Sequence, residues 1–153
     1  GREAQKESFR AHIEMAARHD LPLQIHDREA HEDSIALVRE CANSDQRIVF
    51  HCFSGDAAMA SVLTEHGWYA SFAGPISYPA NEDLRQALAV LPPELILVET
   101  DAPYLTPLPW RGCPNASYVM AHTVRFIADL WGVSEEDACV QLRENTERAY
   151  GSW

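Results

Sequence analysis

Two patterns of hydrophobic and polar positions alternate along this chain. Short runs of mainly aliphatic and aromatic residues have the length of buried strands, and they lie at 21–26, 47–53, 68–74 and 95–100. The stretches between these runs have apolar residues at helical spacing, which predicts helices over 32–42, 56–67 and 81–91. Three further helices are predicted outside the alternation, over 2–19, about 118–131 and 134–149.

Several residues mark where the predicted helices begin and end. Gly67 follows one helix as its stop, and Asn81 opens the next. Ser134 has the residue type of an N-cap, with Asp137 three positions later. The residues 103–115 contain four prolines in a long predicted loop, and loops of that length are more often functional than not.

The regular alternation of strands and helices predicts an α/β fold. Strand, helix and strand in succession imply parallel strands joined by right-handed crossovers. Parallel strands covered on both faces read as nearly continuous apolar runs, as these do. An open doubly wound sheet and part of a TIM barrel both fit this pattern.

Composition and charge narrow the class of protein. The 153 residues are enough for one domain, and a hydrophobic content of 46% allows a sizeable core. No apolar run reaches the roughly 18 residues of a membrane span, and the polar start over 1–10 does not resemble a signal peptide. The four cysteines form no CxxC pair, so we expect a reducing, cytoplasmic compartment. A net charge of −11 argues against charge-driven binding to nucleic acid, although divalent cations could offset it locally.

Three predicted strands end in or just before a residue that can bind metal, namely His26, His51 and Asp101. The carboxyl ends of parallel strands are where α/β folds build their sites, because the loops that follow converge there. Two imidazoles and one carboxylate are a common ligand set for zinc and similar ions. A metal site and a set of partnered core residues both remain possible from the spacing alone.

Strand parity adds Glu99 and Gln24 to this group. Side chains alternate between the two faces of a strand, so Glu99 is expected beneath Asp101 and Gln24 beneath His26. We interpret both as buried, paired residues that orient the ligands by hydrogen bonds rather than as catalytic groups. The other histidines are expected to be solvated surface residues: His12, His19, His31, His66 and His122.

Six ordered motifs resemble the TatD family of metal-dependent deoxyribonucleases: "LPLQIHDR", "VFHCFSGD", "WYASFAG", "LILVETDAPYL", "RGCPN" and "NTERAYG". The resemblance implies a (β/α)8 TIM barrel with a metal site, usually binuclear, at the carboxyl ends of the strands. It implies that His26 and His51 bind one metal and that Asp101 binds the other. The ions would be zinc, magnesium or manganese.

The chain also departs from the family pattern. The HxH pair of the family's first strand and the glutamate of its fourth strand are absent, and Trp110 occupies a position that is often histidine or tyrosine. The resemblance therefore implies that residues 1–153 form a single segment, the C-terminal half of the barrel, with about four βα units that match strands five to eight. We expect this segment to need the missing N-terminal half or a second copy of the chain.

The implied reaction is hydrolysis of phosphodiester bonds in DNA by metal-activated water. Asp101 would act as ligand and as acceptor of the water's proton. Arg28 and Arg111 could bind phosphate, or they could be ordinary surface arginines. Two alternatives stay open: an amidohydrolase-like enzyme that acts on a small ester or amide, and a half barrel that is a binding module without activity.

Overall fold

Four parallel strands form one sheet in the computed structural model, which describes residues 1–151. They lie in the order β1-β2-β3-β4, and every neighbouring pair is parallel. The strands are β1 (Leu23–His26), β2 (Ile48–His51), β3 (Tyr69–Phe72) and β4 (Ile96–Val98). The predicted alternation of parallel strands with helices is confirmed.

All six predicted helices are present, with bounds within two residues of those expected. They are α1 (Arg2–Arg18), α2 (His31–Cys41), α3 (Ala57–His66), α4 (Glu82–Val90), α5 (Met120–Trp131) and α6 (Glu135–Tyr150). Short 3₁₀ turns add η1 (Gly74–Ser77), η2 (Pro93–Leu95) and η3 (Ser117–Val119). In the part of the chain that the structure describes, no helix is long and apolar enough to span a membrane.

The strands are shorter than the apolar runs that predicted them. Trp68 lies outside β3 because its N–H bonds the carbonyl of Leu63, 2.9 Å away at the end of α3, and not a neighbouring strand. Directly after the last residue of β2, Cys52 has a φ of 45°, which turns the chain out of the sheet. Apolar sequence therefore continues past the point at which strand pairing stops.

The residues predicted at the helix ends are found there. Gly67 ends α3 in the left-handed conformation, and the Ser134 hydroxyl accepts the N–H of Asp137 at the start of α6. Asn81 is the N-cap residue of α4, but its side chain forms no capping hydrogen bond and donates instead to the carbonyl of Pro75 at 3.1 Å. A tertiary contact has displaced the local one.

The two faces of the sheet are covered to different extents. One face packs against helices in the main core, which includes the buried side chains of Phe50 and Phe72. The other face holds a small cluster, in which Val49, Tyr69 and Leu97 meet Ala149 near the end of α6. On β1 the inward positions 23 and 25 are buried, but positions 24 and 26 on the second face are exposed.

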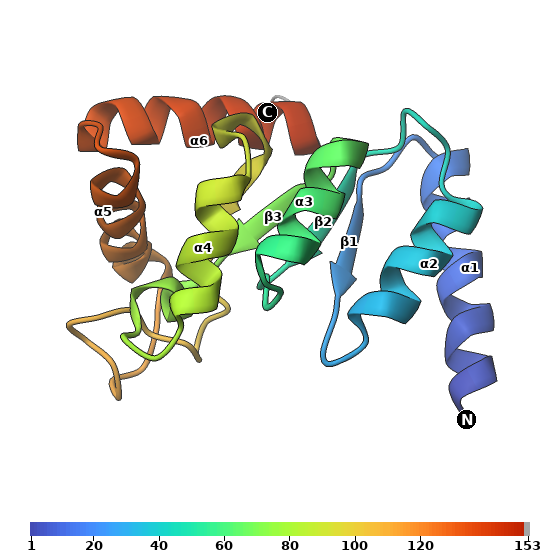
Figure 1. The fold of residues 1–153 in the computed structure, drawn as a ribbon, viewed down its shortest axis with the longest axis horizontal. Coiled ribbons are helices and arrows are strands. Elements are labelled where there is room, and N and C mark those ends of the chain that lie inside the picture. Colours follow the sequence, from blue (N-terminus) through green and yellow to red (C-terminus); the bar gives the residue numbers. More distant parts are fainter. Residues whose placement is uncertain (152–153) are drawn as a thin grey trace.

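Helix α6 and the long loop after β4 lie at opposite ends of the sheet. In Figure 1, α6 runs along the upper edge of the view, and the loop after β4 lies at the lower edge, the same end as the tip of β1. Asn145, fully buried in α6, holds this helix against β4 by donating to the carbonyls of Pro93 and Ile96, at 2.6 and 2.7 Å. Only the last turn of α6 reaches toward the strand ends, where Thr146 and Tyr150 line a cavity with His51.

Candidate metal centre

His26 and His51 stand side by side at the ends of neighbouring strands. The two residues are direct partners in the β1–β2 register, so both side chains lie on the same face. Their ring centroids are 5.7 Å apart, with an angle of 41° between the planes. The structure therefore brings together the two histidines that were proposed from the sequence.

A tighter group joins His51 to two carboxylates from the end of β4. Among the described residues, His51, Glu99 and Asp101 form the group whose ligand atoms all lie within 4.8 Å of one another. His51 Nε2 lies 3.8 Å from Asp101 Oδ1, and His51 Nδ1 lies 2.7 Å from Glu99 Oε1. His26 lies outside this group, next to it.

Glu99 is held by the backbone of the neighbouring strand end. Its Oε2 accepts the N–H of Cys52 at 3.0 Å. Its Oε1 is close enough to His51 for an ion pair, but the geometry gives no hydrogen bond, and Oε1 has no donor among the described residues. A buried carboxylate oxygen without a donor is costly. A divalent cation would offset that charge, and imidazole and carboxylate are suitable ligands, so these residues fit a metal.

The negative charge of this region affects a neighbouring thiol. Burial, together with the smaller effect of the charges of Glu99 and Asp101, raises the pKa of Cys52 to about 12. Burial and the charge of Glu99 also raise the pKa of Tyr150. In both groups burial is the larger cause, and the nearby carboxylate charge acts in the same direction.

Strand β4 ends before the two carboxylates that follow it. Its last residue is Val98, and Asp101 has a φ of 53°, in the left-handed region that residues other than glycine rarely adopt. Glu99 and Asp101 both lie close to His51, whose side chain shares a face with Val49 and Leu97. Strained backbone of this kind is often found at functional sites.

Gln24 was expected to be buried, and that expectation is wrong. Its side chain is exposed, because β1 is an edge strand and α6 covers its second face only in part. Its Oε1 accepts the Tyr150 hydroxyl at 2.9 Å. Gln24 nevertheless borders a cavity of about 250 Å³ together with His51, Glu99 and Asp101.

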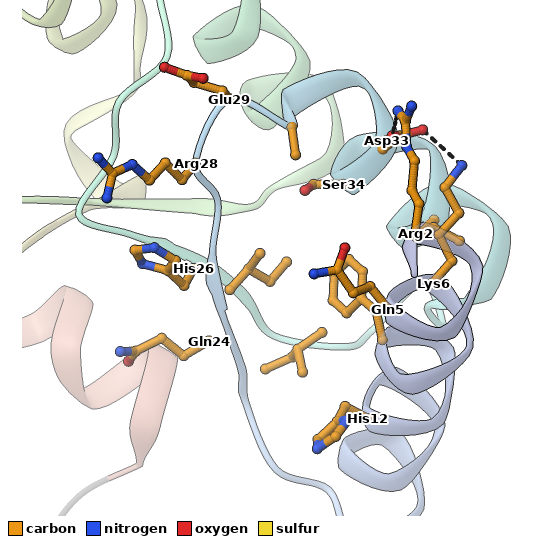
Figure 2. Close-up of a pocket in the computed structure, with 15 residues that line it drawn as sticks. Arg2, Gln5, Lys6, His12, Gln24, His26, Arg28, Glu29, Asp33 and Ser34 are labelled. Carbon is orange, nitrogen blue, oxygen red and sulfur yellow. Dashed lines mark hydrogen bonds and ion pairs between the residues drawn. The ribbon is translucent and has the colours of Figure 1, made fainter.

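The two arginines proposed to bind phosphate are both exposed but lie on different loops. Figure 2 shows Arg28 on the same side of β1 as His26 and Gln24, while the side chains of α1 lie on the other side. Arg111 belongs to the loop after β4, where its guanidinium lies 4.3 Å from the centroid of the Tyr78 ring. Arg28 thus lies on the same side of β1 as His26, whereas Arg111 packs over the Tyr78 ring on another loop.

The sequence analysis missed a pair formed by the buried Asp27 and the partly exposed His31, next to His26. The Asp27 side chain is 5% exposed, accepts the N–H of Ala30 at 3.1 Å and lies 2.7 Å from His31 Nδ1. His31 is therefore not the free surface residue that was expected. An aspartate four residues before a histidine at a helix start was the pattern that could have indicated this contact. His122 is also partnered, since it accepts the Trp110 indole N–H at 3.0 Å.

Comparisons with known proteins show the family of this chain. A family model described as TatD related DNase matches residues 1–151. The uncharacterized metal-dependent hydrolase TatD of Mycobacterium tuberculosis is 42% identical over 96% of this chain and 55% of its own length. The uncharacterized metal-dependent hydrolase YcfH of Escherichia coli K12 is 36% identical over 95% of this chain and 55% of its own length.

Solved structures show the same fold. YjjV, a TatD homologue from Escherichia coli K12, matches with a TM-score of 0.84 and 26% identity, over 92% of this chain and 54% of that one. A hydrolase TatD family protein from Entamoeba histolytica matches with a TM-score of 0.84 over 98% of this chain and 58% of that one, at 16% identity. The chain spans about half the length of the curated relatives it matches. Sequence motifs, fold and strand-end site agree, and this chain belongs to the TatD related DNase family.

Proposed function

We propose that this chain forms part of a divalent-metal-dependent hydrolase that cleaves phosphodiester bonds of DNA. The observation that carries the proposal is the group of His51, Glu99 and Asp101 at the strand ends, with a buried carboxylate oxygen that lacks a donor. The membership of the TatD related DNase family supports the same reaction class. DNA is the proposed substrate and a divalent cation the proposed cofactor.

Three side chains would hold the metal in this proposal: His26, His51 and Asp101. A divalent cation, when bound, lowers the pKa of water toward neutrality and offsets the charge of a phosphate. Asp101, 37% exposed, is the carboxylate that can accept a proton from the attacking water. Glu99 lies against the other nitrogen of His51 and keeps Nε2 directed toward Asp101. We propose two ions in the complete site, of zinc, magnesium or manganese.

Phosphate would be bound by Arg28 and Arg111. Both guanidinium groups are exposed, and neither forms an ion pair with a carboxylate among the described residues. A guanidinium without a carboxylate partner can offer its N–H groups to the phosphate oxygens. These contacts would also offset part of the repulsion between DNA and a chain of net charge −11.

The remaining strands of the barrel would come from the missing N-terminal half or from a second copy of the chain. The exposed Gln24 and His26 support this proposal, because they occupy a face of β1 that a closed barrel would bury. The outer edges of β1 and β4 also have no strand partner within residues 1–151. Sedimentation of the isolated 153 residues as a stable monomer would contradict it.

The test uses the natural full-length protein, with its bound metal removed by a chelator and then restored. We expect Mn²⁺- or Mg²⁺-dependent release of nucleotides from single-stranded DNA, which His51→Ala abolishes and His19→Ala leaves unchanged. His19 is the matched control because it is an exposed histidine at the end of α1, away from the strand ends. Absence of metal-dependent release with properly folded protein would refute the nuclease proposal.

The net charge of −11 favours a second candidate, an amidohydrolase-like enzyme that acts on a small ester or amide. A small neutral substrate avoids the repulsion that a polynucleotide meets. The same preparations would be assayed with small esters and amides. Turnover of these compounds without nucleotide release would favour this candidate.

A further inference from the structure

The row of buried side chains on β1 continues one step past the end of the strand. Leu23 and Ile25 are buried, and Asp27, the first residue after β1, is buried in the same alternation. His26 and Arg28 belong to the exposed positions between them, and Figure 2 shows both on one side of the strand. A carboxylate therefore occupies the next position of an apolar row.

The surroundings of the Asp27 carboxylate make it a costly group to bury. It lies with His31 against the apolar side chains of Phe50 and Phe53, in a space that has no room for a water molecule. A carboxylate away from water needs hydrogen-bond donors from the protein. Asp27 has two, because Oδ1 accepts the N–H of Ala30 at 3.1 Å and Oδ2 lies 2.7 Å from His31 Nδ1. Since a carboxylate only accepts, the ring nitrogen is the donor.

These two bonds close a turn around Arg28 and Glu29. The bond to Asp27 Oδ1 spans both residues, and Glu29 has a φ of 55°, in the region that residues other than glycine rarely adopt. Backbone in that region persists where the surrounding contacts hold it. A longer contact, from the Ser54 hydroxyl to the Asp27 carbonyl at 3.4 Å, links the turn to the loop after β2. The direction in which Arg28 leaves the backbone depends on these contacts.

The two donors of the turn do not themselves need a carboxylate. Ala30 is exposed, and the His31 side chain is 35% exposed, so water can take the place of Asp27 at each of them. An apolar residue at position 27 would continue the buried row of β1 without the cost of removing a carboxylate from water. What the carboxylate adds is a fixed turn.

Arg28, which this turn encloses, stands beside the candidate metal centre. Arg28 and His26 border one cavity, and the ring centroid of His26 is 5.7 Å from that of His51. Arg28 is exposed and forms no ion pair with a carboxylate among the described residues. No carboxylate therefore directs its guanidinium group, and the backbone of the turn has to do so.

We propose that Asp27 and His31 are positioning residues for Arg28. The turn that they close holds the guanidinium group on the His26 side of β1, where it meets a phosphate of the substrate. This inference rests on the proposed function, in which Arg28 binds phosphate. Asp27 and His31 act through the backbone of the turn, and they reduce the conformational freedom that Arg28 loses when phosphate binds.

The test compares variants of the metal-loaded full-length protein. Asp27→Ala and His31→Ala both open the turn, and each should raise the KM for single-stranded DNA about 3- to 30-fold, within the range of coupling between residues of one network. The kcat and the Kd for Mn²⁺ should be nearly unchanged, because His26 is held by its pairing with His51 in the sheet. His31→Ala removes a partly exposed side chain, so it tests the pair even if Asp27→Ala does not fold.

A double-mutant cycle identifies the residue through which the pair acts. Arg28→Ala should raise the KM at least as much as His31→Ala does. The double variant of Arg28→Ala and His31→Ala should have the KM of Arg28→Ala alone, because a turn without its arginine has nothing left to position. Additive effects of the two substitutions would overturn the proposal.

Conservative variants and controls separate the hydrogen bonds from other effects. Asp27→Asn still accepts the Ala30 N–H and can bond the other tautomer of the ring, and His31→Asn can donate from the position of Nδ1. Both should retain a KM close to that of the natural protein. Glu32→Gln removes a charge from an exposed residue in the first turn of α2 and should leave the KM unchanged. A lower melting temperature with an unchanged KM in both alanine variants would show that the pair serves only the fold.

A second measurement separates this inference from the proposed reaction. The probe is a phosphorothioate oligonucleotide, which resists hydrolysis, and its Kd should rise in the alanine variants by the same factor as the KM. A raised Kd without any metal-dependent cleavage by the natural protein would refute the nuclease proposal and support the positioning pair. Cleavage with unchanged KM and Kd would do the reverse. Absence of both binding and cleavage in the natural protein would refute both.

Discussion

Replacing Glu99 by glutamine tests what this carboxylate does for His51. Glutamine keeps the shape of the side chain and can still accept the Cys52 N–H through its carbonyl oxygen. It removes the negative charge beside His51 Nδ1 and places an amide nitrogen or a neutral oxygen there. The substitution thus isolates the charge and the orientation of one imidazole from the packing of the site.

The size of the effect follows from the position of Glu99 against a proposed ligand. Loss of a carboxylate that orients a metal-bound imidazole lowers metal affinity about 10- to 100-fold, or about 1.4–2.7 kcal/mol. A metal present at 100 times its Kd stabilises the folded state by about 2.7 kcal/mol, which falls to about 0.4 kcal/mol if the Kd rises 100-fold. At about 2–4 °C per kcal/mol, the shift in melting temperature falls from roughly 5–10 °C to about 1 °C.

The assay records melting of the full-length protein across a Mn²⁺ titration, with calorimetric titration for the Kd. Glu94→Gln is the matched control, because Glu94 is an exposed glutamate in η2. Without metal, Glu99→Gln should melt at the same temperature as the natural protein or higher, since a buried oxygen without a donor no longer carries charge.

Two results would refute this reasoning. A Kd for Mn²⁺ within twofold of the natural value would show that Glu99 does not act on the metal site. A large loss of stability without metal would show that the carboxylate serves the fold, through the Cys52 N–H, and not the centre.

Three further substitutions give separable results. Asp101→Asn should lower nuclease turnover at saturating metal by at least 10²- to 10⁴-fold with little effect on melting, and near-normal turnover would show that this carboxylate is structural. Asn145→Ala removes the amide donor to the carbonyls of Pro93 and Ile96, the second of them buried, and should lower the free energy of unfolding in urea by about 2–4 kcal/mol; a loss below about 1 kcal/mol would contradict this role of Asn145. The hydrogen bond from Arg2, together with Lys6, lowers the pKa of Asp33, so its stabilising effect is present above the ordinary aspartate pKa and is lost as pH falls through the lowered pKa. Asp33→Asn should therefore lower the melting temperature slightly at pH 7 and not at pH 2, and an equal loss at both would exclude the charge effect.

The hydrophobic pattern determined the elements and their parallel arrangement. Apolar runs of strand length between segments of helical period can bury their surface only as βα units, and the right-handed crossover then sets the strand order. Local chemistry also fixed the ends of α3 and α6 through Gly67 and Ser134, because those contacts lie within four residues. Asn81 opens α4 as predicted, but its side chain bonds a carbonyl from η1 instead of the first turn of the helix.

The same logic placed His26, His51 and Asp101 at one end of the sheet, since parallel strands all finish on the same side. It could not give the partner of Glu99. That residue lies 48 positions after His51, and strand β3 stands between their strands. The N–H of Cys52, which donates to Glu99 Oε2, helps to hold the carboxylate beside His51, and no periodic pattern in the sequence indicates that bond.

Exposure was likewise decided by tertiary structure. The sequence shows Gln24 and Leu23 in one apolar strand, but only the structure shows that β1 is an edge and that Tyr150, 126 residues away, contacts Gln24. The structure also distinguishes two tryptophans that both lie outside the helices and strands. Trp110 is half exposed and donates its indole N–H to His122, whereas Trp68 is buried. The sequence determined which residues can form strands, caps and ligands because those properties are local. Their distances and burial depend on contacts between segments far apart in the chain, and these form only when the whole sheet and its helices pack together.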